Sequence, residues 1–305
     1  MSGHRQSSSR RPSVVLASCQ QLPNSDGDDD GLVEALARAG VDARWLPWDD
    51  PTIHDADAVI LRATWDYPER LAEFIDWTKS VHRLINSPAM VQWNHDKGYM
   101  LDLERAGIPI VPTAVFAPGD HVTIPDGEVV VKPAVAGGSR GAARFIEPAG
   151  ALAHSALLHR DGHRVLVQPF DPLITAGETA LVYLAGERSH AFSKGPMLPQ
   201  PGESGELDES GLYLVEKLTP ALPPESFWAL GDAVMKAAAH AVGVVPSDLL
   251  YARVDLVGTA EAGPKLLEFE AIEPSLGWRQ IAAATDRGMA MDRFAAATAA
   301  ALAGH

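Results

Sequence analysis

The chain has 305 residues with 46% hydrophobic and 21% charged side chains, a composition typical of a soluble globular enzyme with two or three subdomains. Its 40 acidic and 25 basic residues give a net charge of −15, which argues against nucleic acid or an anionic membrane as the main partner. The single cysteine, Cys19, excludes an intramolecular disulfide and indicates a reducing compartment, so we expect a cytoplasmic protein.

The N-terminal part of the chain alternates predicted strands with predicted helices. Residues 1–12 are rich in Ser and Arg and indicate a disordered tail. The pattern then predicts strands at 13–18, 41–45 and 58–62 and helices at 32–37 and 71–81. This alternation indicates a doubly wound parallel sheet, in which ligands bind at the carboxyl ends of the strands. The acidic loop 26–30 suits the positive N-terminal end of the first helix.

The composition changes near residues 112–118, which we interpret as a domain boundary. The remaining predicted elements are helices at 93–106, 224–242 and 289–302, strands at 128–131 and 164–168, and a hairpin of 181–184 with 190–193. The polar stretch 198–211 has no core pattern, which is typical of a lid or binding loop. We therefore predict three folded domains, at 13–111, 112–170 and 171–305.

A lysine and a glycine-rich loop follow a predicted strand. Lys132 precedes a loop that ends at Gly141 and contains Gly137, Gly138 and Ser139. Glycines let backbone N–H groups approach phosphate oxygens, and cations neutralise phosphate charge. The loop lacks the GxxxxGK[ST] pattern of a Walker loop, and a simple turn is an alternative interpretation.

Two further strand ends carry side chains that suit a nucleotide. Gln168 and Phe170 end one strand, where backbone groups and an aromatic ring could meet a purine, and Asp171 could bind ribose hydroxyls. A plain strand–turn is the alternative for these residues. Lys194 ends a later strand before the polar loop, so it fits either a phosphate contact or a solvated surface lysine.

The segment KLLEFEAIEPSL, residues 265–276, places Glu268 and Glu270 two residues apart in an apolar run. Residues i and i+2 of a strand point to the same face, and a hairpin with the earlier run YARVDLV would bring Asp255 beside them. Three converging carboxylates repel one another unless a cation lies between them. Hard divalent ions such as Mg²⁺ prefer oxygen ligands of this kind, so the pattern predicts a metal site.

The order of these motifs resembles the ATP-grasp superfamily from residue 13 onward. The resemblance implies an ATP-grasp fold that combines α/β and α+β parts: a doubly wound N-terminal domain on the substrate side, a small lid subdomain at 112–170 and a C-terminal subdomain with the metal site. The residues that match the family's ATP ligands are Lys97, Lys132, Gly137, Gly138, Ser139, Gln168, Phe170, Asp171 and Lys194. Those that match its metal ligands are Asp255, Glu268 and Glu270, and those that match its catalytic cations are Arg253 and Lys194. Most members carry Asn where this chain has Glu270.

Within the superfamily, the motifs LRATWDY, WNHDK and EFEAIEPSL are similar to the cyclo-ligase group of the D-cycloserine pathway, which is related to prokaryotic glutathione synthetase. The resemblance implies an amino-acid-like substrate with a free carboxylate. Arg62 suits that carboxylate because its planar fork pairs bidentately. Asp66 or Glu273 suits an ammonium group, and Ser275 suits a hydrogen bond. A local ion pair at a strand end is the alternative for Arg62 and Asp66.

We therefore predict an ATP- and Mg²⁺-dependent carboxylate–amine ligase that activates a small amino acid as an acyl phosphate and closes a ring. The alternatives are an intermolecular ligase of the glutathione synthetase kind and a small-molecule kinase on the same fold. Mn²⁺ is an alternative to Mg²⁺, and a homodimer is an alternative to a monomer. We expect no nucleic-acid or membrane partner.

Overall fold

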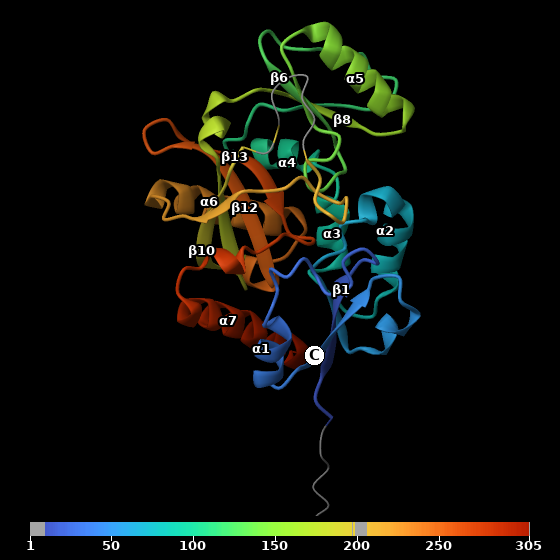
Figure 1. The fold of residues 1–305 in the computed structure, drawn as a ribbon, viewed down its shortest axis with the longest axis vertical. Coiled ribbons are helices and arrows are strands. Elements are labelled where there is room, and N and C mark those ends of the chain that lie inside the picture. Colours follow the sequence, from blue (N-terminus) through green and yellow to red (C-terminus); the bar gives the residue numbers. More distant parts are fainter. Residues whose placement is uncertain (1–9, 197, 199–205, 305) are drawn as a thin grey trace, which may run out of the picture.

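The computed structural model describes residues 10–196, 198 and 206–304. Residues 1–9 of the predicted tail and 199–205 of the predicted polar loop lie outside the described residues. Three sheets organise the rest of the chain, and Figure 1 shows them as an upper lobe around β6 and β8 above a body that holds the other two sheets.

The N-terminal sheet is parallel, as the alternation of strands and helices predicts. Its strands lie in the order β2-β1-β3-β4, and the carboxyl ends of β1 and β3 form the point where the order reverses. The loops that follow these two strands, 19–31 and 62–66, therefore emerge at the same edge. The elements are β1 (Ser13–Ser18), α1 (Leu32–Arg38), β2 (Asp42–Pro47), β3 (Ala58–Leu61), α2 (Leu71–Ser80) and β4 (Leu84–Ile85).

The lid sheet is antiparallel and small, with the order β5-β8-β6-β7. One face of this sheet packs on the helix at 148–160 through a core that includes Val129, Val131, Ala151 and Leu158. The opposite face is directed toward the body. The elements are β5 (Ala114–Phe116), β6 (Val129–Pro133), β7 (Ala143–Phe145), α5 (Pro148–Arg160) and β8 (Val165–Pro169).

The C-terminal sheet is antiparallel, with the order β11-β10-β9-β12-β13. Its apolar face packs on α6 through a core that includes Leu181, Val254, Phe269 and Val234. The predicted hairpin around Gly186 is confirmed, because β9 pairs with β10. The elements are β9 (Glu178–Leu184), β10 (Glu187–Lys194), β11 (Leu218–Pro220), α6 (Glu225–Ala241), β12 (Tyr251–Thr259) and β13 (Gly263–Glu270).

The last helix, α7 (Ala284–Ala303), joins the N-terminal and C-terminal sheets. It lies beside α1 in Figure 1, and residues of both helices share one core with β1 and β9. It begins earlier than the predicted 289–302, because residues 284–288 carry little apolar periodicity although they are helical. Within the described residues, no helix is long and apolar enough to cross a bilayer.

The predicted single helix at 93–106 is wrong, because the chain forms two helices here. They are α3 (Pro88–Asn94) and α4 (Tyr99–Arg105). The Oδ1 atom of Asp96 accepts a hydrogen bond from the backbone of Gly98 at 2.7 Å, and the backbone N–H of Lys97 donates to Ala134 O at 2.8 Å. The resulting turn takes Lys97 out of a helix and directs it toward the lid.

Candidate active site

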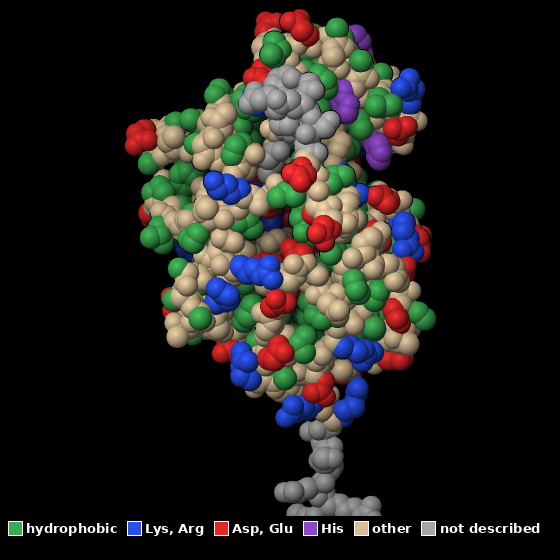
Figure 2. Space-filling view, viewed as in Figure 1, with side chains coloured by type: hydrophobic (Ala, Val, Ile, Leu, Met, Phe, Trp, Pro, Cys, Tyr) green, Lys and Arg blue, Asp and Glu red, His purple; other side chains and the backbone are tan. Residues whose placement is uncertain are grey.

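A cavity of about 460 Å³ lies between the three sheets. Residues of the lid, of the C-terminal sheet and of the loop after β3 all line it. Figure 2 shows acidic and basic side chains close together where this face of the molecule is hollowed below the upper lobe. The cavity therefore combines opposite charges from distant parts of the chain, as expected for a site that binds phosphates and a metal ion.

One face of the C-terminal sheet supplies most of these charges. Strand pairing places Asp255 opposite Glu268 and Arg253 opposite Glu270 on β12 and β13, which confirms the predicted hairpin. Directly opposed residues and residues two apart share a face. Through Ala180 on β9, which pairs with Asp255, the same face continues to the opposed pair of Glu178 and Lys194. The charged residues of this face are Glu178, Lys194, Arg253, Asp255, Glu268 and Glu270.

Lys194 lies on β10 at one side of this face and is paired with two acids. Its Nζ atom lies 2.7 Å from Asp255 Oδ2 and 3.0 Å from Glu178 Oε2, and its side chain is only 3% exposed. Burial lowers the pKa of the lysine, but the two carboxylates outweigh burial and hold that pKa well above its ordinary value. Burial likewise opposes ionisation of Asp255, yet Arg253 and Lys194 keep its pKa below the ordinary value. Lys194 and Asp255 are therefore both in their charged forms.

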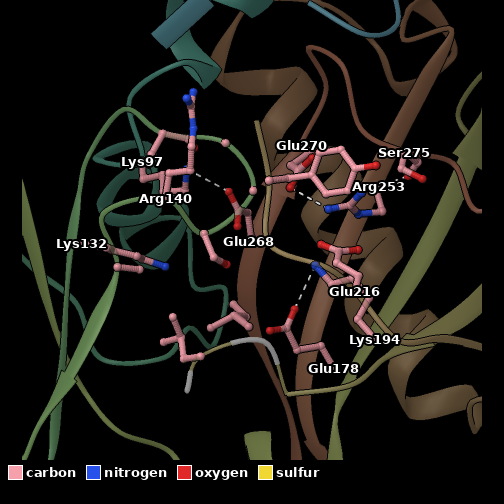
Figure 3. Close-up of a pocket in the computed structure, with 18 of the residues that line it drawn as sticks. Lys97, Lys132, Arg140, Glu178, Lys194, Glu216, Arg253, Glu268, Glu270 and Ser275 are labelled. Atoms are coloured by element: carbon pink, nitrogen blue, oxygen red, sulfur yellow. Dashed lines mark hydrogen bonds and ion pairs between the residues drawn. The ribbon is translucent and has the colours of Figure 1, made fainter. Parts of the chain in front are cut away.

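The two glutamates of β13 also meet cations, which Figure 3 shows as dashed contacts. Glu268 Oε1 lies 3.1 Å from Lys97 Nζ, and Glu270 Oε1 lies 2.6 Å from Arg253 Nη2. Burial opposes ionisation of Glu268, but the nearby lysines lower its pKa below the ordinary value. Glu270 differs, because burial and the carboxylates of Glu268 and Asp255 outweigh Arg253 and raise its pKa to about 7. Its compensation by positive charge is therefore incomplete.

The donor chemistry of the three predicted metal ligands fits Mg²⁺, since all are hard carboxylate oxygens on one sheet face. The described residues contain no group of three His, Cys, Asp or Glu side chains already gathered as a metal site. Instead, each of Asp255, Glu268 and Glu270 is paired with a lysine or arginine. A metal would thus take the place of protein cations.

The lid brings the predicted phosphate-binding elements to the opposite wall, where Lys132 reaches toward the C-terminal sheet in Figure 3. The ammonium group of Lys97 donates to Ala136 O at 2.5 Å and so braces the start of the glycine loop. Gly138 has a φ of +57°, and an added Cβ would lie 2.3 Å from Tyr213 Cβ, so only glycine fits there. Gly137 and Ser139 also line the cavity.

The predicted adenine and ribose residues line the cavity at the end of β8. The side chain of Gln168 donates to Thr113 Oγ1 at 2.8 Å, and the Arg144 guanidinium lies 3.7 Å from the centre of the Phe170 ring. Asp171 caps a short helical turn through Leu173 N, and its other oxygen contacts Lys265 Nζ at 2.9 Å. A ribose contact by Asp171 would compete with this ion pair.

The structure corrects the predicted substrate roles of Arg62 and Asp66, because it does not bring either side chain into the cavity wall. Arg62 is 1% exposed, and its Nε and Nη2 atoms each donate to a carboxylate oxygen of Asp29, so this bidentate edge is already used within the protein. Asp66 accepts a hydrogen bond from Trp48 Nε1 at 2.8 Å. The alternative of a local ion pair after β3 fits both side chains, since Asp66 Oδ2 also lies 3.8 Å from Arg70 Nη1.

Glu273 and Ser275 do line the cavity, but the Ser275 hydroxyl is already engaged. It donates to Asp28 Oδ2 at 3.0 Å, while its backbone oxygen accepts from Arg253 Nη1 at 2.9 Å. Ser275 therefore connects the acidic loop after β1 to the arginine of the active site. Asp28 accepts two further hydrogen bonds, from the backbone N–H groups of Gly277 and Arg279.

Two acids of the site were missed by the sequence interpretation, Glu178 and Glu216. Glu178 is the partner of Lys194, and Figure 3 shows Glu216 beside Lys194 and Arg253. Glu178 is the first residue of the largely apolar strand β9, and an acid at the start of such a strand is the only local signal for it. Glu216 lies in a polar stretch without regular pattern, and no local signal marks it.

The three sheets and the charged cavity define the class of ATP-grasp enzymes. A D-alanine–D-alanine ligase from Bacillus anthracis, solved in complex with ATP, shares the fold with a TM-score of 0.61 and 12% identity over 94% of each chain. The family model of the N-terminal domain of D-cycloserine synthetase DcsG matches residues 14–86.

The cycloserine biosynthesis protein DcsG of Streptomyces lavendulae is 34% identical over 280 residues, which cover 82% of this chain and 88% of the relative. The crystal structure of D-cycloserine synthetase DcsG superimposes with a TM-score of 0.81 and 30% identity, over 95% of this chain and 99% of that chain. The chain belongs to the DcsG family of ATP-dependent ligases that form carbon–nitrogen bonds.

Proposed function

We propose that this ligase acts on an amino acid that carries a ureido group on its side-chain oxygen and closes it into a ring, with Mg²⁺ as the metal. The substrate carboxylate attacks the γ-phosphorus of ATP, so an acyl phosphate forms as the bond to ADP breaks. A substrate nitrogen then attacks the acyl carbon, phosphate leaves, and the nitrogen loses a proton. The DcsG relative supports a cyclising reaction over an intermolecular ligase or a kinase.

The charge pairs of the cavity suggest how the nucleotide is held. Asp255, Glu268 and Glu270 would hold Mg²⁺, which would supply positive charge to the phosphates. If these carboxylates held a metal ion, the ion pairs of Glu268 with Lys97 and of Glu270 with Arg253 would be released, and both cations would be available to phosphate oxygens. Positive charge placed around a transferring phosphoryl group stabilises its transition state.

The lid supplies the second half of the proposed nucleotide site. Lys132 and the loop of Gly137, Gly138 and Ser139 would cover the phosphates, and Gln168 with Phe170 would hold the adenine. Burial and the neighbouring Lys97 lower the pKa of Lys132, whereas Glu268 raises it, and the net direction is downward. Phosphate oxygens would restore the favourable environment for its charged form.

The observation that carries the proposal is the single sheet face of alternating acids and cations opposite Lys132. A coupled assay for ADP with O-ureidoserine and a panel of plain amino acids tests it. We expect ADP and phosphate release only with the ureido compound, and a cyclic product by mass spectrometry. Hydroxylamine should divert the acyl phosphate into a hydroxamate, whereas a stable phosphorylated product would establish a kinase instead.

The metal is tested in the same assay by titration of Mg²⁺ and Mn²⁺ into chelator-treated enzyme. The compartment and the oligomeric state rest on other grounds: the single cysteine supports a cytoplasmic location, and light scattering would distinguish a monomer from a homodimer.

A further inference from the structure

Glu273 is a cavity residue whose carboxyl group has no hydrogen-bond or ion-pair partner among the described residues. Its Oε2 atom is buried and forms no hydrogen bond, and neither oxygen is in an ion pair with any residue that the structure describes. Burial and then the neighbouring Glu270 raise the pKa of this carboxyl well above its ordinary value. A buried carboxyl without a partner is costly, and an incoming cation would relieve that cost.

The backbone around Glu273 is fixed by other residues, so its side chain is not needed for that purpose. Tyr251 donates to Ile272 O at 2.8 Å, Trp65 Nε1 donates to Glu273 O at 2.9 Å, and Arg62 donates to Pro274 O at 3.1 Å. Three consecutive carbonyl groups are therefore anchored to the N-terminal domain and to β12. The Glu273 carboxyl is held at a defined place in the wall and remains free for a ligand.

Tyr67 supplies a second polar group without a partner at the same place. Its side chain is 5% exposed, its ring stacks on Phe74 at 4.8 Å between centroids, and it lines the cavity. Its hydroxyl forms no hydrogen bond with the described part of the chain. Trp65, two residues before Tyr67, donates to Glu273 O at 2.9 Å, so Tyr67 and Glu273 belong to the same part of the cavity wall. Burial and next the charge of Glu273 raise the pKa of Tyr67 well above its ordinary value, which keeps its hydroxyl neutral. A neutral hydroxyl can accept a hydrogen bond from an ammonium group.

We propose that Glu273 and Tyr67 form the subsite for the ammonium group of an α-amino-acid substrate, an inference that rests on the proposed function. The carboxylate to be phosphorylated must lie beside Arg253 and Glu270. In an α-amino acid the ammonium group is on the adjacent carbon, so its partner must be close to those residues. Glu273 lines the cavity two residues before Ser275, whose carbonyl oxygen accepts from Arg253 Nη1 at 2.9 Å, so it meets this requirement. Asp66 is outside the wall and is engaged by Trp48.

A structural role is the rival explanation for the unpaired oxygen. Arg62 Nη1 and Thr64 Oγ1 are also buried without a partner among the described residues, so the carboxyl of Glu273 would have a structural role if it served buried polar groups of this kind. In that case Glu273→Gln would lower the melting temperature and would affect all substrates alike. The ammonium subsite predicts an effect only on compounds with an amino group.

The test compares wild type and Glu273→Gln with O-ureidoserine and with the analogue in which hydrogen replaces the amino group. We expect Glu273→Gln to lower kcat/KM for the amino compound by about 10- to 100-fold, the range for a lost hydrogen bond to a charged group. The analogue should lose much less, and the melting temperature and affinity for an ATP analogue should stay unchanged. Glu216→Gln, which removes a different cavity acid, should keep the wild-type preference for the amino compound.

Equal losses for both compounds, or an unchanged preference in Glu273→Gln, would overturn the subsite. Absence of ring closure by wild type would refute the proposed function instead. In that case, calorimetry in the presence of a non-hydrolysable ATP analogue still tests the subsite by the affinity of wild type for each compound. Only a partner for the ammonium group would make wild type bind the amino compound more tightly than the analogue.

Discussion

Replacement of Lys194 by methionine tests whether the buried charges of the site form one coupled group. Methionine keeps the unbranched shape of lysine and removes its charge. Asp255 would retain Arg253, whose Nε lies 2.9 Å from it. Glu178, whose side chain is 7% exposed, would lose the lysine that is its ion-pair partner within the described residues. The substitution therefore leaves one buried carboxylate without a cation.

The expected cost follows from that single unpaired group. Removal of one partner of a buried ion pair costs about 3–5 kcal/mol. Since Asp255 keeps a cation, we expect the lower end of this range, about 3 kcal/mol of the free energy of unfolding. With an m-value of about 3 kcal/mol/M, the urea midpoint should fall by about 1 M. Tryptophan fluorescence can follow the transition, because seven tryptophans lie in the chain.

The double variant Lys194→Met/Glu178→Gln is the matched control, since it also removes the orphaned carboxylate. We expect it to recover at least half of the lost stability while both variants stay inactive in ligation. A loss below about 1 kcal/mol in the single variant would contradict the expected cost of an unpaired buried charge. Equal instability of the single and double variants would show that Glu178 is not the cause.

Three further predictions concern catalysis and pH. Glu268→Gln should abolish ADP release while circular dichroism stays unchanged, and wild-type activity in this variant would refute its metal role. Asp28→Asn should lower kcat by at least about 10-fold without weakening nucleotide binding. The reason is that Asp28 accepts a hydrogen bond from Ser275, whose carbonyl oxygen in turn orients Arg253. An unchanged single-turnover rate would contradict this prediction. Burial lowers the pKa of His190 to about 4. Stability from the neutral ring should therefore fall as pH drops below 6.5 toward 4, by about 2 kcal/mol between pH 7 and 5 in urea unfolding, and His190→Gln should remove that part.

The elements that sequence predicts well here are those with strong local patterns. The period-two spacing of Glu268 and Glu270 and the short turn before them identify the β12–β13 hairpin, and its register places Asp255 beside Glu268. Likewise, the alternating strands and helices before residue 86 identify the parallel sheet. The confirmed predictions thus depend on residues that are close in sequence or on a repeated period.

The wrong predictions concern residues whose contacts or local structure depend on partners far away in the sequence. Arg62 looks like a substrate ligand after a strand, but Asp29 and the carbonyl of Pro274 occupy its guanidinium. Lys97 falls within an apparently continuous helical pattern, yet a contact with Ala134 of the lid accompanies a turn there. Neither partner is visible in the local sequence, because both contacts depend on how the sheets come together.

The carboxylates of the cavity differ in how far neighbouring lysines and arginines compensate their charge. The poorly compensated carboxylates indicate where the cations of a ligand would bind. Asp255 and Glu268 have cations strong enough to keep their pKa values below the ordinary range, so the protein itself stabilises their charge. Glu270 shares Arg253 with Asp255, and Glu273 forms no ion pair within the described residues. Burial raises the pKa of both carboxyl groups. A divalent ion beside Glu270 and an ammonium group beside Glu273 would complete the balance. On the proposed function, a metal nucleotide and an amino acid bound together would complement these charges more fully than either ligand alone.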